Sequence, residues 1–138
     1  MVKLSSPSSF VVHAIQSSAD WQWFEDLLRT YANTDLDEPK LSTIWKDLEN
    51  LQVRYAPPVG AAVLLRFQDG HADQVVGCGA ITNTDVKNTC EIKRLYIQPS
   101  FRGRGGAKVL IQSLLQKAQQ DGYDQALSLI HISEPTRQ

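Results

Sequence analysis

The sequence predicts an α/β fold of the α+β type, in which strands and helices form one domain over residues 1–138. Three observations predict it. The periodicity of the apolar residues changes along the chain in the order β-α-α-β-β-β-α-β. An Asp-Gly pair lies between two β-prone runs, which is typical of a hairpin turn. A glycine-rich loop then connects a strand directly to a helix with a single apolar stripe.

The N-terminal part of the chain predicts one strand and two helices. Residues 10–15 form a short apolar run, which we interpret as the first strand. Asp20 is a suitable N-cap for a helix over residues 21–32, where aromatic and leucine residues keep helical spacing. A second helix is predicted over residues 41–51 from a similar apolar stripe, and two prolines follow it.

The central part predicts three strands and a long helix. Residues 60–67 and 74–82 are β-prone and are joined by the polar turn with the Asp-Gly pair. A second polar connection leads to a strand over residues 90–97. A helix begins at the glycine-rich loop and stops near Gly122, because glycine commonly ends helices.

The glycine-rich loop covers residues 102–107 and reads Arg-Gly-Arg-Gly-Gly-Ala. A loop at a helix N-terminus gathers unpaired main-chain N–H groups where the helix dipole is positive. Such a loop binds phosphate, and the guanidinium groups of Arg102 and Arg104 can reinforce a bound anion. The loop lacks both the Gly-Lys-Ser/Thr of a P-loop and the spacing of a dinucleotide-binding fingerprint.

This segment resembles the acyl-CoA site of the GNAT superfamily of N-acetyltransferases, whose pattern is Arg/Gln-x-x-Gly-x-Gly/Ala. The match lies directly after the strand that reads Cys-Glu-Ile-Lys-Arg-Leu-Tyr-Ile, and the wider resemblance spans about residues 10–126. It implies a mixed, mostly antiparallel sheet with helices on both faces. It also implies an enzyme that transfers the acetyl group of acetyl-CoA, as co-substrate, to a primary amine by direct attack in a ternary complex.

The resemblance further implies which residues bind acetyl-CoA. The main-chain amides of the glycine-rich loop would hold the pyrophosphate. Main-chain groups at the end of the preceding strand would pair with the pantetheine arm, and one N–H group would polarise the thioester carbonyl. The expected cofactor-binding residues are Leu95, Tyr96, Ile97, Arg102, Gly103, Arg104, Gly105, Gly106 and Ala107.

Glu91 is the candidate catalytic residue. A protonated amine has no lone pair for attack, so a base must remove its proton, directly or through water. Glu91 matches the glutamate that several GNAT members carry near the start of this strand. Strand alternation predicts that Glu91 shares a face with Leu95 and Ile97, unless a bulge intervenes. The alternative is a structural ion pair between this carboxylate and Lys93 or another cation.

Composition limits the partners and the location. The 138 residues carry a formal net charge of −1, which argues against nucleic acid or an acidic membrane as the main partner. The N-terminus lacks an apolar signal core, so a cytoplasmic location is expected. Cys78 and Cys90 are expected to be buried reduced thiols, and the histidine spacing predicts no metal. The expected partner is a small-molecule or peptide amine acceptor, and homodimer formation stays open.

The C-terminal residues resemble translated adapter DNA and not a natural protein sequence. Residues 127–137, Leu-Ser-Leu-Ile-His-Ile-Ser-Glu-Pro-Thr-Arg, read as the in-frame translation of a transposon mosaic end and its sequencing adapter. We therefore expect the native sequence to end near Ala126. The GNAT fold continues with another helix and usually two strands, which complete the acceptor pocket and often supply a tyrosine as general acid. Those elements would be missing.

Two other functions are compatible with the same segment. A GNAT-like domain can bind acyl-CoA without catalysing transfer. Residues 101–106 also resemble an Arg-Gly-Gly box that binds nucleic acid. Such boxes are repeated, disordered and strongly basic, whereas this copy is single and lies between a strand and a helix.

Overall fold

The computed structural model describes residues 9–36, 42–70 and 72–128. Five strands form one sheet in the order β1-β2-β3-β4-β5. The pairs from β1 to β4 are antiparallel, and β5 is parallel to β4, so the predicted mixed, mostly antiparallel sheet is confirmed. The strands are β1 (Ser9–Ala14), β2 (Gly60–Gln68), β3 (Asp73–Asn83), β4 (Thr89–Ile97) and β5 (Gln125–Ser128).

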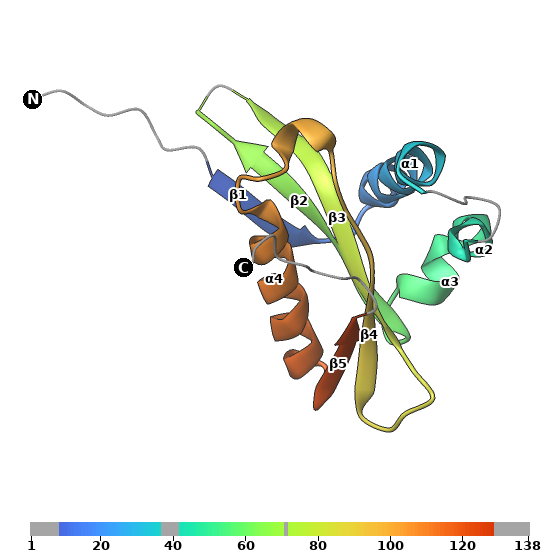
Figure 1. Ribbon diagram of the computed structural model, residues 1–138. Helices are drawn as coiled ribbons and strands as arrows, with labels where there is room; N and C mark the ends of the chain where they lie inside the picture. Colours follow the sequence, from blue (N-terminus) through green and yellow to red (C-terminus); the bar gives the residue numbers. More distant parts are fainter. Residues whose placement is uncertain (1–8, 37–41, 71, 129–138) are drawn as a thin grey trace, which may run out of the picture.

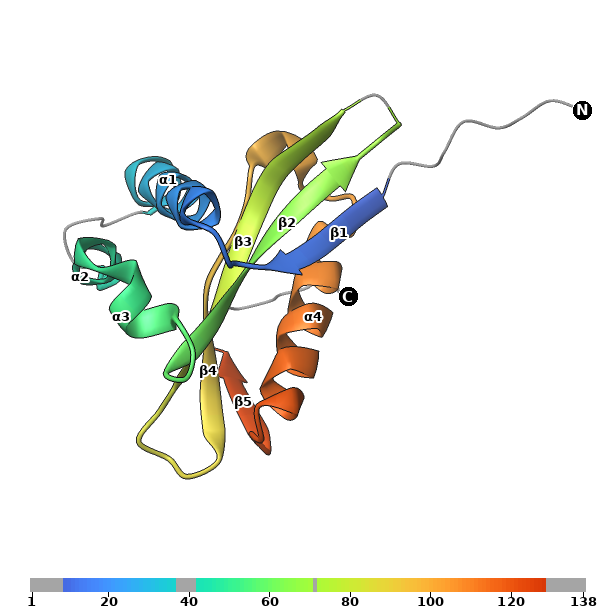
Figure 2. The same cartoon turned by 180° about the vertical axis from the view of Figure 1, so that it is seen from behind.

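Helices cover both faces of the sheet (Figure 1 and Figure 2). Three of them lie on one face, and α4 lies on the other, beside β5. A short 3-10 turn, Pro99–Phe101, leads from β4 into the glycine-rich loop. The helices are α1 (Ser18–Thr34), α2 (Ile44–Glu49), α3 (Leu51–Tyr55) and α4 (Gly106–Gln120).

The start of α1 differs from the prediction. The helix begins at Ser18, and Ser17 is its N-cap, because the Asp20 N–H donates to Ser17 Oγ at 3.0 Å. Asp20 in turn accepts from the Ser17 N–H at 3.2 Å and from the Gln16 N–H at 3.0 Å. This reciprocal arrangement is a capping box. The hydrogen bond from Gln16 is the largest cause that lowers the pKa of Asp20 below its usual value.

The second predicted helix is divided in two. Asn50 separates α2 from α3 with φ −161° and ψ 86°, which is not a helical conformation. Its side-chain Oδ1 accepts from the Val53 N–H at 3.4 Å and caps α3. Asparagine favours such caps because its side chain competes with the helical backbone. Residue 41, where the predicted helix begins, lies outside the described residues.

The two faces of the sheet carry separate apolar cores. One core joins the inner sides of α1, α2 and α3 to the sheet and includes Phe24, Ile44, Tyr55 and Tyr96. The other joins α4 to the opposite face. Its buried members are Ala61, Val63, Leu65, Val76, Ile81, Cys90, Ile92, Ile97, Leu110, Leu114 and Ala118. Each helix group therefore fixes one side of β4, the strand that leads to the glycine-rich loop.

Cys78 and Cys90 are free and buried, as predicted, and burial raises the pKa of both thiols. Within the described ranges, no helix is long and apolar enough to cross a membrane, and no three His, Cys, Asp or Glu side chains could hold a metal together. Leu127 and Ser128 belong to β5, whereas residues 129–138 of the adapter-like segment lie outside the described residues.

Candidate functional site

The glycine-rich loop forms a turn that leaves main-chain N–H groups free. Gly103 has φ +77° and Gly105 has φ +95°, a left-handed conformation that favours glycine. Gly105 is the N-cap of α4, and its carbonyl accepts from the Val109 N–H at 3.3 Å. Among the residues that the structure describes, none accepts a hydrogen bond from the N–H groups of residues 103–108. A row of donors therefore lies at the positive end of α4.

The space around this loop suits an anion. A Cβ built on Gly103 or Gly105 would meet nothing within 4 Å, so both glycines border open space. A Cβ on Gly106 would lie 3.1 Å from Leu65 Cδ2 and 3.2 Å from the Phe10 ring. Gly106 therefore lets the start of α4 pack closely on β1 and β2, and this packing fixes the donors against the sheet.

Arg102 ties the loop to the C-terminal end of α1. Its Nε donates to the Ile97 carbonyl at 2.7 Å, and its Nη2 donates to Asp35 Oδ2 at 2.6 Å. The guanidinium also lies over the Tyr96 ring, 5.5 Å from the centroid. A hydrogen bond from the Thr34 hydroxyl, followed by Arg102, holds the pKa of Asp35 below its usual value. Arg102 thus pairs with protein groups in this structure.

Arg104 lies on the other side of the loop. Its guanidinium carbon is 5.2 Å from the Phe101 ring centroid and 5.6 Å from that of Phe67, and the residue is exposed. These ring contacts hold a positive charge at the rim of the loop. The donors that directly border the open space are main-chain N–H groups.

The edge of β4 next to the loop is open in the described residues. β5 pairs with Thr89–Ile92, and no described residue pairs with the second half of β4 on this side. The Gln98 N–H donates to the Val76 carbonyl of β3 at 2.8 Å. Because N–H groups alternate in direction along a strand, the Ile97 N–H points away from β3. It faces the open edge.

The Leu95 N–H also points to this edge. The Arg94 carbonyl accepts from Cys78 Sγ of β3 at 3.5 Å. The carbonyl and the N–H of one planar trans peptide unit point in opposite directions. Counting back from Gln98, whose N–H donates to β3, strand alternation directs the Leu95 N–H away from β3. Tyr96 differs, because alternation turns its main chain toward β3. Its side chain is 4% exposed and stacks on Tyr31 of α1, with ring centroids 5.5 Å apart.

A β-bulge interrupts β4 between Glu91 and these donors. The register with β3 shifts between Cys78 and Ala80, so that one residue, Gly79, lies opposite both Arg94 and Leu95. Arg94 has φ +61°, which is uncommon for a residue with a side chain. A Cβ on Gly79 would lie 2.8 Å from Leu95 Cδ2, so a glycine opposite the bulge leaves room for that side chain.

The bulge overturns the predicted face of Glu91. Glu91 pairs with Thr82, whose Oγ1 donates to the Arg54 carbonyl of α3 at 3.4 Å, so Glu91 faces the three-helix side. Leu95 and Ile97 pack instead in the core under α4. The prediction of a shared face was wrong because one extra residue inverts strand alternation.

Glu91 is half-buried on this face, near Lys93. The salt bridges among the described residues do not include Glu91, so the predicted alternative of a Glu91–Lys93 ion pair is not formed there. Desolvation lowers the pKa of the Lys93 ammonium group, and the Arg94 charge adds to this shift. The Glu91 carboxylate is therefore not tied up in a contact ion pair with another described residue.

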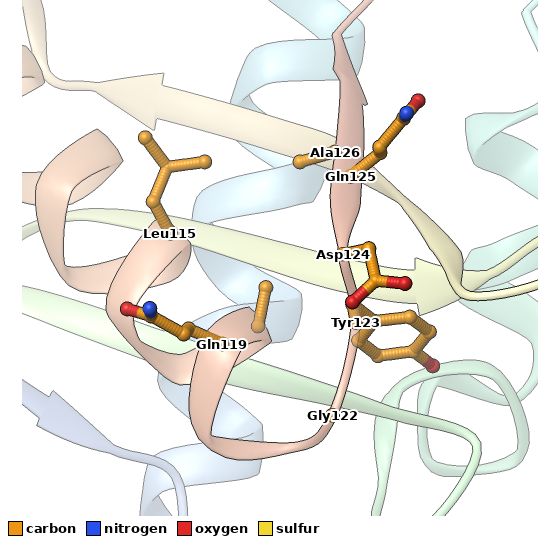
Figure 3. A pocket seen from close by; sticks show the side chains of 8 residues that line it. Leu115, Gln119, Gly122, Tyr123, Asp124, Gln125 and Ala126 are labelled. Atoms are coloured by element: carbon orange, nitrogen blue, oxygen red, sulfur yellow. The ribbon is translucent and has the colours of Figure 1, made fainter.

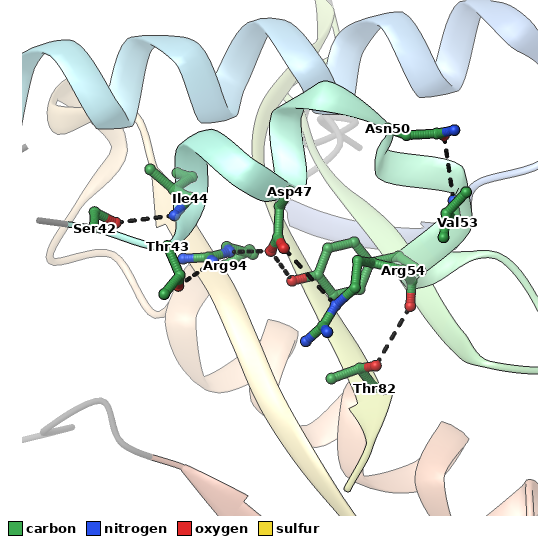
Figure 4. Close-up of polar contacts among 10 residues, drawn as sticks. Ser42, Thr43, Ile44, Asp47, Asn50, Val53, Arg54, Thr82 and Arg94 are labelled. Atoms are coloured by element: carbon green, nitrogen blue, oxygen red, sulfur yellow. Dashed lines mark hydrogen bonds and ion pairs between the residues drawn. The ribbon is translucent and has the colours of Figure 1, made fainter. Parts of the chain in front are cut away.

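A buried polar cluster that was not predicted from the sequence joins α2 and α3 to β4 (Figure 4). The Arg94 and Asp47 side chains are 9% and 6% exposed, and Arg94 Nε donates to Asp47 Oδ2 at 2.8 Å. The Tyr55 hydroxyl donates to the same oxygen, and Arg94 Nη2 donates to Thr43 Oγ1 at 2.9 Å. Arg54 Nε lies 3.7 Å from Asp47 Oδ1. Burial, reinforced by the bond to Asp47, raises the pKa of Tyr55 well above its usual value.

A signal for this cluster was present in the sequence. Asp47 lies three residues after Ile44 and one before Leu48, on the apolar stripe that predicted this helix. A carboxylate at a core position needs a buried partner, because an unpaired buried charge is costly. The identity of the partner could not be read, since Arg94 is 47 residues away in the sequence.

A hollow of ≈ 430 Å³ lies at the opposite end of α4 from the loop (Figure 3). It is bordered by the last turns of α4 and by β5. None of the predicted site residues contributes to it. The lining residues are Leu115, Ala118, Gln119, Gly122, Tyr123, Asp124, Gln125 and Ala126. The hollow is therefore separate from the site formed by the loop, the β4 edge and Glu91.

Comparisons with known proteins find a matching family and a related sequence. The model of the acetyltransferase (GNAT) family matches residues 16–138. An uncharacterized N-acetyltransferase of Schizosaccharomyces pombe is 27% identical over 120 residues, which cover 87% of this chain and 72% of that protein.

Solved structures show the same fold. A GNAT-family acetyltransferase from Staphylococcus aureus superposes with a TM-score of 0.62 at 16% identity, over 84% of this chain and 70% of that one. A Mycobacterium tuberculosis protein, crystallised with CoA, superposes with a TM-score of 0.63 at 23% identity, over 90% of this chain and 66% of that one.

Proposed function

The chain belongs to the acetyltransferase (GNAT) family, and we propose that it moves the acetyl group of acetyl-CoA directly onto the primary amine of an acceptor bound beside Glu91. The family makes the chain an acyltransferase that uses an acyl-CoA co-substrate and an amine acceptor. The observation that carries the proposal is the row of N–H groups at residues 103–108 that have no acceptor among the described residues, next to the part of the β4 edge that no described strand covers.

The loop fits the pyrophosphate of acetyl-CoA. Its free donors lie at the positive end of α4, and Gly103 and Gly105 leave the space in front of them open. Main-chain N–H groups bind phosphate well at such helix ends. The Arg104 charge at the rim would attract the anion. Arg102 would hold the loop in shape through the Ile97 carbonyl and Asp35.

The open edge of β4 fits the remainder of the co-substrate. The Ile97 N–H would pair with an amide of the pantetheine arm, as an added strand pairs with a sheet edge. The Leu95 N–H would donate to the thioester oxygen. A fixed donor at this point stabilises the negative charge that develops when the carbonyl carbon is attacked.

Glu91 would act as the general base. It would accept the proton of the acceptor ammonium group, directly or through water, and so free the nitrogen lone pair. The nitrogen then bonds to the carbonyl carbon and the carbon–sulfur bond breaks. CoA leaves as the thiolate, which takes up the second proton that the nitrogen must lose, so that the products are the neutral amide and the CoA thiol. Desolvation near Lys93 indicates a site partly shielded from water, which strengthens such electrostatic effects.

The first experiment tests the loop by calorimetric titration with acetyl-CoA. Gly105→Glu places a carboxylate in front of the donors and should abolish measurable binding, because it fills the loop and repels phosphate. Gly70→Glu is the matched control. Gly70 also has a positive φ of +89° and open space around it, but it lies in the turn between β2 and β3. Equal affinity in the unchanged chain and in Gly105→Glu would refute the site.

The second experiment tests Glu91 by following thiol release from acetyl-CoA against a panel of amines. Glu91→Gln should lower kcat at neutral pH by roughly 10²-fold or more, since general bases typically contribute 10²–10⁴-fold. The affinity for acetyl-CoA should stay unchanged. Unaltered turnover would place the base elsewhere. A chain that binds acetyl-CoA but acetylates no amine would favour the non-catalytic alternative, and binding of labelled RNA alone would overturn both.

A further inference from the structure

We propose that Arg94 and Asp47, supported by Thr43 and Tyr55, are positioning residues that lock the bulge of β4 and so aim the Leu95 N–H at the thioester oxygen. The proposal rests on the proposed function for the role of that N–H group. The lock itself rests on contacts between described residues. Figure 4 shows Arg94 reaching from β4 to α2, where it meets Asp47 and Thr43.

The bulge places Arg94 in an unfavourable backbone conformation. A residue with a Cβ at φ +61° carries a local cost of roughly 1–3 kcal/mol, which surrounding contacts must offset. The Arg94 conformation sets the plane of the peptide unit that carries the Leu95 N–H. A relaxation of Arg94 toward ordinary extended backbone would rotate that N–H away from the open edge. The direction of the donor therefore depends on what holds Arg94.

Side-chain contacts hold Arg94 from the helix side. Its planar guanidinium donates through Nε to Asp47 and through Nη2 to Thr43, at 2.8 Å and 2.9 Å. Two donors in a rigid fork fix orientation as well as distance. The Tyr55 hydroxyl, kept protonated by burial, holds the shared Asp47 oxygen from the other side. Arg94 is thereby fixed to α2 and α3.

A contact from a β3 side chain to the Arg94 carbonyl also holds this peptide unit. Cys78 Sγ lies 3.5 Å from the Arg94 carbonyl, opposite in direction to the Leu95 N–H. The unit is thus held at its carbonyl and at the preceding side chain, and no described residue accepts a hydrogen bond from its N–H. These contacts fix the orientation of the peptide unit and leave its N–H available to a ligand.

Simple attachment of α2 to the sheet explains the cluster less well. Apolar residues of similar volume hold helices to sheets at equal or lower cost than a buried ion pair does. The surrounding core on this face already does so with Ile44, Leu48 and Tyr96. The two hydrogen bonds of the Arg94 guanidinium fix the orientation of a β4 residue that has a positive φ, and apolar packing would not fix that orientation.

The test compares Asp47→Asn, Arg94→Ala and Arg94→Gly with Glu25→Gln as control. Glu25 forms an exposed ion pair with Arg29 at 2.9 Å on α1, far from β4 in the sequence. With the full chain and saturating acetyl-CoA, the three cluster variants should lower kcat about tenfold or more, since loss of one such donor costs 10²–10³-fold. The affinity for free CoA, which lacks the carbonyl, should change less than about threefold, and Arg94→Lys should recover part of kcat.

Arg94→Gly is the most discriminating variant. Glycine adopts φ +61° without cost, so Arg94→Gly permits the bulge but removes the fork that holds it in one conformation. Wild-type kcat in a folded Arg94→Gly would overturn the proposal, because backbone conformation alone would then suffice. The same holds if all three variants lower only the melting temperature and leave kcat of the folded protein unchanged.

A second measurement does not depend on activity. In amide NMR spectra, Asp47→Asn should shift or broaden the Leu95 resonance and leave those of β1 unchanged. An unmoved Leu95 resonance contradicts the lock, whatever the chain catalyses. If the unchanged chain neither binds acetyl-CoA nor transfers acetyl groups, the proposed function fails, and the NMR result still decides whether the cluster holds the bulge.

Discussion

The two faces of the sheet differ in the side chains that they bury: one is apolar, and the other contains buried charges. The face under α4 is closed by apolar side chains, and the glycine-rich loop above it presents main-chain donors to the open space. The face under α1, α2 and α3 contains buried charges at Asp47 and Arg94, and Glu91 also faces this side. Main-chain N–H groups can bind the phosphates that every acyl-CoA carries, whereas an ionisable side chain is needed to take a proton from the reacting amine. The comparison predicts that substitutions on the two faces fail in different ways.

The largest effect is expected on the three-helix face. Asp47→Ala removes the partner of a buried arginine and should lower the free energy of unfolding by about 3–5 kcal/mol, as for other broken buried ion pairs. Urea unfolding measures it. Asp47→Ala combined with Arg94→Met should recover much of the loss, because no unpaired charge remains. A loss below about 1 kcal/mol would mean that water solvates Arg94 as well as Asp47 does.

A large effect of a different kind is expected on the α4 face. Leu114 is fully buried, and Leu114→Ala should cost about 2–5 kcal/mol through lost burial and the cavity left behind. Below the melting temperature, kcat should stay near that of the unchanged chain, since no polar group is disturbed. Measured stability and turnover together sharpen the comparison. A kcat drop as large as that of Asp47→Asn would erase the distinction between the faces.

A smaller effect is expected at the glycines with positive φ. Gly105→Ala and Gly70→Ala should each cost roughly 1–2 kcal/mol, because a Cβ disfavours the left-handed region at both sites. Only Gly105→Ala should weaken acetyl-CoA binding, since its methyl group borders the free donors. Thermal unfolding and calorimetric titration give the two numbers. Equal binding by both variants would show that the loop is a turn and nothing more.

The smallest effect is expected for the link between the loop and α1. The Arg102–Asp35 pair is partly exposed, so Asp35→Asn should cost at most about 1 kcal/mol. The pKa of Asp35 is lowered in the folded chain, so its contribution is fully present above the unfolded value near 3.8. The stability difference between the chain and Asp35→Asn should be constant at neutral pH. It should disappear as the pH falls through the lowered pKa, and a difference that grows there would contradict the assignment.

The comparison also explains what the sequence could predict. The strands β1 to β4, the hairpin and α4 follow from local periodicity, and each predicted end of these four strands lies within one residue of its observed position. The glycine-rich loop could be predicted from the sequence because consecutive residues form it. Even the division at Asn50 had a local cause, since asparagine favours caps.

The face of Glu91 was not readable, because it depends on a bulge that long-range contacts hold. Nothing near Arg94 in the sequence requires a positive φ there. The requirement comes from Asp47, from Cys78 and from the room that Gly79 leaves opposite. The role of Arg102 was hidden for the same reason, because its partner Asp35 lies 67 residues away. Tertiary contacts determine the conformation of Arg94 and the role of Arg102. A single sequence does not show which distant residue each of them contacts.

The central claim is that main-chain donors of the loop and of β4 hold acetyl-CoA. A crystal structure of the chain with bound CoA tests it most directly. We predict the pyrophosphate within hydrogen-bond distance of the N–H groups of residues 103–108, and the pantetheine arm along the edge of Leu95 and Ile97. CoA bound only at the hollow between α4 and β5, with both sets of N–H groups free, would contradict it.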